Sequence, residues 1–204
     1  KSLLREHNLD ISLSDTDLLF YLIENLGILE ALSKIEGAFS MCILSLKEKK
    51  VFLIRDIWGQ KPLFFSIDKY LKVSSSFKFL AEYQENKVID KFNKFFFELL
   101  GFVPSKGTIF KNIKKVLPGE IIEINLDDYS LDTKTYKRRK SEMKISDNPD
   151  LIFEAIKTSI NRQGDVNKCC LAFSGGVDST IIATAISRLG LSIPLVHLDI
   201  PGNE

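Results

Sequence analysis

Cysteine, histidine and tryptophan are scarce in this 204-residue chain, which contains three cysteines, two histidines and one tryptophan. Two cysteines are adjacent and the third stands far away, so the chain has neither the spacing of a disulfide framework nor that of a zinc site. This usage is typical of a reducing compartment and predicts a cytoplasmic protein. We expect Cys42, Cys169 and Cys170 to be small apolar residues of the core.

Net charge and long apolar runs are also lacking. A formal net charge of +1 creates no field that would attract nucleic acid or an anionic membrane. No stretch approaches the roughly 18 consecutive apolar residues of a transmembrane helix, and no signal peptide is visible. The hydrophobic content of 45% and the charged content of 27% are those of an ordinary globular protein. We therefore expect neither a nucleic-acid partner nor a membrane partner.

The length allows one large core or two modest ones. A polar and charged stretch from Asp127 to Asn148, which includes a basic run at residues 137–140, indicates a solvated linker. We place this linker at residues 136–148, between a first domain at 1–135 and a second at 149–204. The chain starts at Lys1 without methionine and stops at Glu204 soon after a predicted strand, so we expect both ends to be truncated.

The first domain mixes helices with strands in a pattern that predicts an α+β fold. Ser14 and Asp17 have the spacing of a helix capping box, and apolar residues recur at helical intervals until Gly27. Apolar runs separated by charged turns indicate strand hairpins, and a charged loop, RDIWGQKP, interrupts the sheet. The predicted elements after the first helix are a helix at 28–35, strands at 38–46, 51–55, 63–66, 70–74 and 120–125, and a helix at 91–100.

Four phenylalanines, Phe92, Phe95, Phe96 and Phe97, stand together with Leu99 among the lysines of the segment Lys91–Leu100. Aromatic side chains dominate protein cores by the area that they bury, so we interpret this segment as a core-facing helix rather than as a nucleic-acid platform.

The second domain begins with Asn148 and Pro149, a suitable cap and first turn for an apolar-faced helix. A short apolar run at 169–173, a helical pattern at 180–189 and a further apolar run at 194–200 follow. Strand, helix and strand at this spacing predict a parallel crossover, with ligands bound at the carboxyl ends of the strands.

The loop between the first of these strands and its helix has the sequence SGGVDS. Gly175 and Gly176 lack Cβ atoms, so backbone N–H groups there and at Val177 can approach an anion at the positive end of the helix. Ser174 and Ser179 add hydroxyl donors. Asp178 would repel a bare phosphate and is better suited to hold a magnesium ion that bridges phosphate oxygens. The simpler interpretation is a serine–glycine turn that caps a helix. No Gly-Lys-Ser/Thr follows, so the loop is not a Walker A motif.

SGGVDS resembles the PP-loop of ATP pyrophosphatases, which cleave ATP to AMP and pyrophosphate while activating a substrate as its adenylate. Several strings of the first half, in their order, are similar to one member of that superfamily, the asparagine synthetase family. Arg55-Asp56 with Gly59, Lys61, Pro62 and Leu63 resembles the family's RDxxGxKPL. The weaker matches are SDTD at 14–17, GAFS at 37–40, Gly101 to Pro104, Thr108-Ile109-Phe110 and Pro118-Gly119.

This resemblance implies a class II glutaminase domain, a four-layer αββα sandwich of two antiparallel sheets between helices. It is followed by the start of an α/β parallel-sheet PP-loop ATP pyrophosphatase domain. In that family a cysteine at the mature amino terminus attacks the glutamine amide, but neither it nor the arginine and oxyanion residues have counterparts here. Asp15 alone matches a glutamine contact, as a ligand of the α-ammonium group. It can equally be a helix cap.

Three other positions bear on the resemblance. Cys42 lies inside a predicted strand without a free α-amino group or a nearby base, so it cannot replace the missing nucleophile. Arg55, Asp56 and Lys61 are interpreted as residues that fix the geometry of their loop. Ser76 stands where the family has an acidic residue, which calls the coupling of the two sites into question.

The implied function belongs to asparagine biosynthesis: ATP and magnesium activate a carboxylate, with aspartate the expected acceptor, and ammonia from glutamine attacks the acyl-adenylate. By the same resemblance the backbone at Ala172 and Leu198 flanks the adenine, and a homodimer is compatible with it. His197 is interpreted as structural. The alternatives are another amide-forming enzyme, such as a β-lactam-forming or sugar-amidating synthetase, and a non-catalytic nucleotide-binding regulator. A transfer-RNA-modifying PP-loop enzyme fits the near-neutral charge less well.

Overall fold

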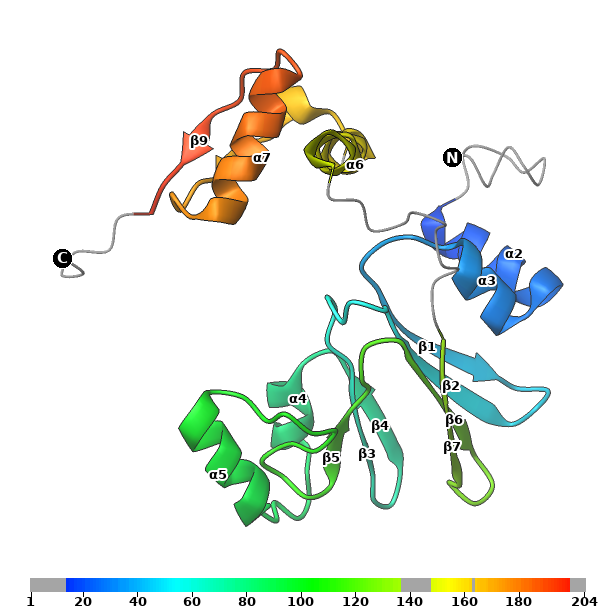
Figure 1. Cartoon of the computed structure of the whole chain (residues 1–204). Coiled ribbons are helices and arrows are strands. Elements are labelled where there is room, and N and C mark those ends of the chain that lie inside the picture. Colours follow the sequence, from blue (N-terminus) through cyan, green and yellow to red (C-terminus); the bar gives the residue numbers. More distant parts are fainter. Residues whose placement is uncertain (1–13, 137–147, 163, 199–204) are drawn as a thin grey trace. The chain divides into compact units, whose positions relative to one another are not determined.

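The computed structural model describes residues 14–136, 148–162 and 164–198. The chain divides into two compact units, residues 1–140 and 141–204, coloured blue to green and yellow to red in Figure 1. The division falls inside the segment 136–148 that the sequence marks as a linker. The basic run at 137–140 lies outside the described residues.

Two antiparallel sheets form the centre of the first unit (Figure 1). One sheet has the strand order β1-β2-β6-β7 and the other has the order β4-β3-β5. The hairpin β1–β2 and the pair β3–β4 correspond to the predicted hairpins. The strands are β1 (Ser40–Ser45), β2 (Lys50–Arg55), β3 (Phe64–Ile67), β4 (Leu71–Ser74), β5 (Ile113–Lys115), β6 (Glu120–Asn125) and β7 (Leu131–Thr135).

The main core of this unit lies between the two sheets. Alternate residues of β2 and β6 face inward there, and they meet Phe65 of β3. The members of this inter-sheet core are Val51, Leu53, Leu63, Phe65, Val116, Ile122 and Ile124, all nearly inaccessible to solvent. The residues between them on β2 and β6, such as Ile54 and Ile121, pack on Leu32 of a helix instead.

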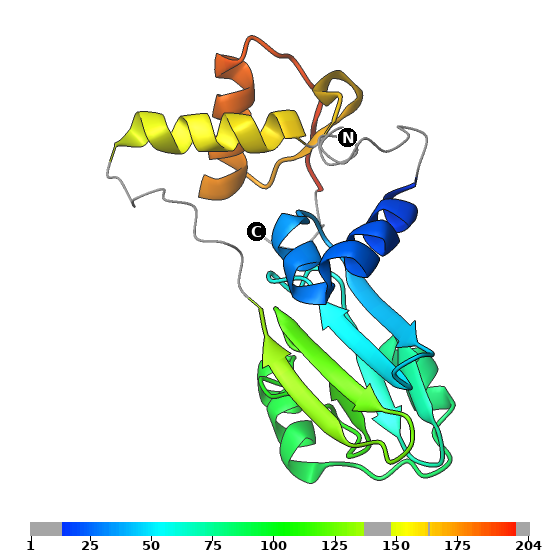
Figure 2. The ribbon, with the colours of Figure 1, turned by 90° about the vertical axis from the view of Figure 1, so that its right-hand side faces the viewer.

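Helices lie on the outer faces of both sheets. Helix α2 (Asp15–Leu26) begins with the predicted capping box, in which Ser14 Oγ accepts the N–H of Asp17. It is followed by α3 (Ile28–Lys34), and Figure 2 shows both blue helices beside the four-stranded sheet. On the other sheet, Phe64 points away from the inter-sheet core and contacts Phe77 of α4 (Phe77–Glu82). The layers therefore run helix, sheet, sheet, helix.

Helix α5 (Lys91–Leu100) has the predicted bounds, but its orientation is a correction. Phe92 is 69% exposed and Phe95 is 58% exposed, whereas Asn93 is buried and bound to Asp90 and Ser105. The prediction that the aromatic side chains face the core is therefore wrong. Periodicity identifies an apolar face, but it does not show that the rest of the unit lies against that face.

The cysteines and β7 are two further corrections. Cys42, Cys169 and Cys170 are exposed, not buried in a core: Cys42 lies on the outermost strand of its sheet, and the other two precede the short strand of the second unit. Strand β7 pairs with β6 within the stretch 127–148 that the sequence indicates as polar linker. All five of its residues are exposed, so no apolar alternation marks it in the sequence.

The loop that joins the two sheets is fixed by Arg55 and Asp56, as the sequence predicts. Asp56 is fully buried, and its carboxylate accepts the N–H groups of Trp58, Gln60 and Lys61 at 3.0–3.1 Å. The Arg55 guanidinium donates to the carbonyls of Gly59, Lys61 and Val116. Gly59 has φ +63°, and a Cβ there would lie 2.7 Å from Pro118 Cγ, which explains the glycine.

The second unit contains α6 (Pro149–Arg162), a 3₁₀ turn (Val166–Lys168), β8 (Leu171–Ala172), α7 (Val177–Arg188) and β9 (Leu195–Val196). Asn148 Oδ1 accepts the N–H of Asp150, which confirms the predicted cap of α6. Within the described ranges no helix is long and apolar enough to cross a bilayer.

The buried carboxylate of Asp56 leads to the first prediction. Desolvation acts to raise its pKa, but the backbone N–H groups outweigh this and hold the pKa below the ordinary 3.8. We expect Asp56→Asn to lower the free energy of unfolding by about 2 kcal/mol, because the amide nitrogen cannot accept the Lys61 N–H. Urea unfolding followed by fluorescence of Trp58, the chain's one tryptophan, measures this loss.

The pH dependence provides a second readout. A lowered folded-state pKa stabilises the fold above the unfolded value of 3.8 and loses this effect as the pH falls through the folded value. The parent should therefore lose stability below about pH 4 more steeply than the variant does. Asp128→Asn, in an exposed turn, is the control and should change stability by less than about 0.5 kcal/mol. Equal losses in the two variants would contradict the role given to Asp56.

Candidate functional site

The SGGVDS loop lies at the carboxyl end of β8, where the second unit changes from strand to helix. β8 pairs in parallel with β9, with Leu171 opposite Leu195 and Ala172 opposite Val196. The strand–loop–helix order is the one predicted, although β8 is shorter than the run 169–173. β9 (Leu195–Val196) is likewise shorter than the predicted run 194–200: residues 197 and 198 follow it outside the strand, and residues 199 and 200 lie outside the described part of the chain.

Backbone conformation opens this loop towards the start of α7. Gly175 has φ +77°, a left-handed conformation that glycine adopts without strain, and a Cβ there would meet no atom within 4 Å. Gly176 is the N-cap of α7 in an extended conformation. The first N–H groups of a helix have no acceptor within the helix, so those of Val177 and Asp178 are directed towards this open side.

The two loop hydroxyls are engaged with each other and with the backbone. Ser174 Oγ lies 3.2 Å from Ser179 Oγ and accepts the N–H of Gly176. Ser179 Oγ donates to the Gly176 carbonyl at 3.0 Å, and Thr180 Oγ1 donates to the same carbonyl at 2.9 Å. A phosphate would therefore have to replace internal hydrogen bonds at Ser174 and Ser179, which the sequence does not indicate.

Asp178 lies in the first turn of α7 with an exposed side chain. The described residues contain no cluster of three or more aspartate, glutamate, histidine or cysteine side chains that would hold a metal alone. Magnesium commonly takes one or two carboxylates together with substrate phosphates, and Asp178 offers one such carboxylate. The loop is thus suited to a metal that arrives with a nucleotide.

Ala172 and Leu198 lie near the carboxyl ends of β8 and β9, respectively. Ala172 is exposed at the end of β8, and Leu198, which follows β9, is 79% exposed. Between them, His197 Nδ1 is hydrogen-bonded to the Phe173 carbonyl at 2.9 Å. This bond ties the ends of the two strands together and accords with the structural interpretation of His197.

Contacts near the carboxyl end of α7 and along its buried face hold the helix in place. Ala185 and Ile186 are its buried apolar residues, and the Arg188 guanidinium lies 4.1 Å from the ring centre of Phe153 on α6. These contacts fix the helix while leaving its amino terminus open, which is the geometry that anion binding needs.

Asp15, the predicted glutamine contact, lies in the other unit, in the first turn of α2 with an exposed side chain. Ser14 and Asp17 form the cap of this helix, so the alternative role of Asp15 as the cap is filled by its neighbours. Ser76, which departs from the family pattern, caps α4 by accepting the N–H of Phe79.

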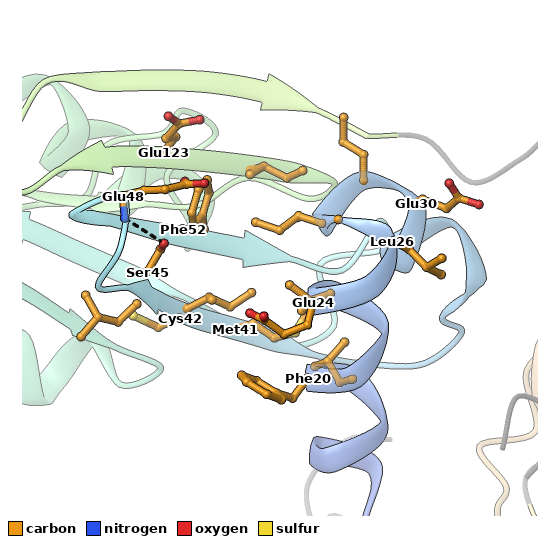
Figure 3. Close-up of a pocket in the computed structure, with 18 of the residues that line it drawn as sticks. Phe20, Glu24, Leu26, Glu30, Met41, Cys42, Ser45, Glu48, Phe52 and Glu123 are labelled. Atoms are coloured by element: carbon orange, nitrogen blue, oxygen red, sulfur yellow. Dashed lines mark hydrogen bonds between the residues drawn. The ribbon is translucent and has the colours of Figure 1, made fainter. Parts of the chain in front are cut away.

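The first unit contains a wide groove that the sequence does not predict. It lies between α2–α3 and the hairpin β1–β2, with a volume of about 1360 Å³ (Figure 3). Phe20 of α2 and Met41 and Cys42 of β1 are among its lining residues. The only signal in the sequence is the apolar surplus on α2, which cannot be distinguished from an ordinary core-facing pattern.

Comparison with known proteins places the first unit in a family. A family model described as a glutamine amidotransferase domain matches residues 2–137. Asparagine synthetase [glutamine-hydrolyzing] 1 of Bacillus subtilis is 30% identical over 170 residues, covering 80% of this chain and 27% of the relative. The mouse asparagine synthetase [glutamine-hydrolyzing] is 24% identical over 199 residues, covering 85% of this chain and 31% of the relative.

Solved structures give a looser likeness. Glutamine phosphoribosylpyrophosphate amidotransferase from B. subtilis, complexed with ADP and GMP, superposes with a TM-score of 0.41 at 17% identity. The match covers 96% of this chain and 41% of that one.

The family assignment thus depends on the sequence matches, and the chain spans less than a third of the length of the two asparagine synthetases. The strings RDxxGxKPL and SDTD, the two antiparallel sheets and the match over residues 2–137 agree with one another. The chain therefore belongs to the glutamine amidotransferase domain family, in the form found in glutamine-hydrolysing asparagine synthetases.

Proposed function

We propose that this chain contributes to a glutamine-dependent, ATP-consuming synthetase of the asparagine type. In this proposal the first unit is scaffold of the glutaminase domain and the second unit carries the ATP loop. The observation that carries the ATP part is the left-handed Gly175 followed by the open amino terminus of α7, at the carboxyl end of a parallel strand. The asparagine synthetase relatives align over more of the chain than the amidotransferase match alone, which supports the inclusion of the second unit.

The loop would bind the phosphates of ATP mainly through its backbone. N–H groups at Gly175 and Val177 can donate to phosphate oxygens, and that of Gly176 would do so in exchange for its bond to Ser174 Oγ. The start of α7 also favours negative charge. Ser174 and Ser179 would exchange their mutual hydrogen bond for bonds to the nucleotide. Donors fixed around the departing pyrophosphate stabilise the charge that develops as a carboxylate attacks the α-phosphate.

Asp178 would hold magnesium against the phosphates from the first turn of α7. When bound, the ion supplies charge neutralisation for the departing pyrophosphate. The backbone of Ala172 and Leu198 would flank the adenine, since Ala172 ends β8 and Leu198 follows β9 beside the loop.

Glutamine is the proposed source of ammonia, and Asp15 would bind its α-ammonium group by a charge-assisted hydrogen bond. The exposed carboxylate of Asp15 does not perform the capping role, which Ser14 fills. Ammonia would attack the acyl-adenylate of the acceptor, which we take to be aspartate.

The ATP loop can be tested by pyrophosphate exchange into ATP, measured on the complete protein with magnesium and aspartate. We expect Asp178→Asn to reduce the exchange rate about 100-fold, because the carboxylate that holds the ion beside the phosphates is lost. Asp150→Asn is the matched control, since Asp150 also lies in the first turn of an exposed helix, α6.

Two outcomes would contradict the proposal in different ways. Full exchange by the Asp178 variant would remove its role with the metal but leave the ATP loop standing. An unmutated protein that exchanges no pyrophosphate with any carboxylate would overturn the ATP-dependent activation itself.

The position of Cys42 generates a further prediction about glutamine hydrolysis. Desolvation raises the pKa of its thiol above the ordinary value, although the residue is partly open to solvent, and it lies within β1 opposite Leu53. A thiol of this kind is a poor nucleophile at neutral pH. The 204-residue chain alone should therefore release no ammonia from glutamine above the buffer rate, in a coupled glutamate dehydrogenase assay.

Cys42→Ser serves as the control for this assay. It should leave the background release of ammonia by the 204-residue chain unchanged, and it should not alter glutamine hydrolysis by the complete protein. Ammonia release that disappears in this variant would show that Cys42 is a nucleophile after all.

A further inference from the structure

Two hydroxyl groups converge on the carbonyl of Gly176, the N-cap of α7. This carbonyl accepts the N–H of Thr180 at 3.0 Å, which is the first hydrogen bond of the helix. It also accepts the hydroxyl of Ser179 at 3.0 Å and the hydroxyl of Thr180 at 2.9 Å. One carbonyl oxygen thus has three donors, although it has only two lone pairs. The position of this peptide group is therefore held from several sides.

The direction of the Gly176 carbonyl decides the direction of the Val177 N–H. The two groups belong to one planar trans peptide, so they point to opposite sides of it. The carbonyl points into the first turn of α7, where its three donors lie. The Val177 N–H consequently points out of the amino terminus of the helix, towards the open side of the loop. A rotation of this peptide would turn that donor away from an anion.

The side chains of Ser174 and Ser179 form a ring of hydrogen bonds that begins and ends at Gly176. The Gly176 N–H donates to Ser174 Oγ at 3.3 Å, and Ser174 Oγ lies 3.2 Å from Ser179 Oγ. Ser179 in turn donates to the Gly176 carbonyl. A hydroxyl has one hydrogen, so Ser179 uses its own on the carbonyl and accepts that of Ser174.

Binding of a phosphate through Ser179 opens this ring. Phosphate oxygens accept hydrogen bonds, so the Ser179 hydroxyl can reach one only by withdrawing its hydrogen from the Gly176 carbonyl. The carbonyl then keeps the Thr180 N–H and the Thr180 hydroxyl. Among the described residues, Thr180 is the one side chain that still donates to this carbonyl.

A threonine that donates to the carbonyl four residues earlier is common in helices and commonly has no functional role. Two other threonines of this unit do the same: Thr184 donates to the Thr180 carbonyl and Thr158 to that of Glu154, each at 2.8 Å. Those carbonyls belong to peptides inside a helix, where the N–H group of the same peptide is also bonded. The peptide held by Thr180 differs, because its N–H is a donor at the open end.

We infer that Thr180 is a positioning residue of the ATP loop: its hydroxyl holds the Gly176–Val177 peptide in place when Ser179 leaves it for a phosphate. Thr180 does not bind the nucleotide itself, since its hydrogen is directed to the carbonyl. The inference rests on the proposed function and adds a residue to the machinery of that loop. It requires the hydroxyl to matter more with the phosphate bound, because Ser179 holds the same carbonyl in the free loop.

The test compares the complete protein with its Thr180→Val variant, which keeps the branched shape and loses the hydroxyl. Titration calorimetry with magnesium pyrophosphate is the first readout. We expect the variant to bind pyrophosphate about fivefold more weakly, which is the effect of one lost hydrogen bond. Its midpoint of thermal unfolding should change by less than about 2 °C, because Thr180 is exposed and Ser179 still holds the carbonyl.

Two further variants make the result specific. Thr180→Ser restores a hydroxyl at the same position and should bind pyrophosphate within about twofold of the unmutated protein. Thr184→Val removes the same kind of bond one turn further along α7, from an equally exposed threonine. It should leave the binding of pyrophosphate unchanged.

Pyrophosphate exchange into ATP provides the second readout. Thr180→Val should raise the KM for ATP about fivefold and leave the KM for aspartate unchanged, because only phosphate binding uses the Val177 N–H. A merely structural role would reduce the amount of active protein, and hence the maximal rate, without changing either KM.

Three outcomes would overturn the inference. Equal pyrophosphate binding by Thr180→Val and the unmutated protein would show that the carbonyl needs no hydroxyl, while the ATP loop itself would stand. Equal weakening by Thr184→Val would indicate a general effect on α7. An unmutated protein that binds no magnesium pyrophosphate would remove the proposed ATP loop, and the role of Thr180 with it.

Discussion

The first unit depends on one buried carboxylate. Asp56 lies where the chain leaves the four-stranded sheet for the three-stranded one, and its two oxygens accept three backbone N–H groups of the loop. A buried charge is tolerated only when hydrogen bonds replace its hydration, and here the loop backbone supplies them. The Arg55 guanidinium holds the same loop by donating hydrogen bonds to backbone carbonyl groups. These bonds fix the path of the chain from one sheet to the other.

This dependence explains why the string RDxxGxKPL is both recognisable and structural. The arginine supplies a guanidinium for carbonyls, the aspartate supplies a carboxylate for N–H groups, and the glycine stands where a Cβ would collide with Pro118. A charged cluster in a loop invites a catalytic interpretation. Here the Asp56 carboxylate and all three guanidinium nitrogens of Arg55 are hydrogen-bonded to backbone groups, which is the arrangement of a structural cluster.

Features that depend on contacts within a few residues were predicted correctly from the sequence. The exposure of side chains, which depends on more distant parts of the chain, was not. The capping box at Ser14, the hairpins and the strand–loop–helix order around Gly175 all depend on contacts within a few residues, so their signals are local. The exposed aromatic face of α5 and the exposure of Cys42 depend on what lies across from them, which no short window contains. β7 was missed for a related reason, because a strand exposed along its whole length has no alternation to detect.

The candidate ATP loop illustrates the same limit at a site. Two glycines and a helix start were predictable, but the mutual hydrogen bond of Ser174 and Ser179 was not, since side-chain rotamers are chosen by neighbours. The loop thus keeps its hydroxyls satisfied when no anion is bound. Occupying it would require only the exchange of internal hydrogen bonds for bonds to the anion, a modest cost compared with leaving the buried hydroxyl of Ser179 unsatisfied.

The two edges of the four-stranded sheet differ in a way that bears on assembly. β7 carries aspartate and lysine side chains, which protect its edge of the sheet from pairing, whereas β1 carries no charged side chain. Pairing of the first unit with another strand at the β7 edge is therefore disfavoured.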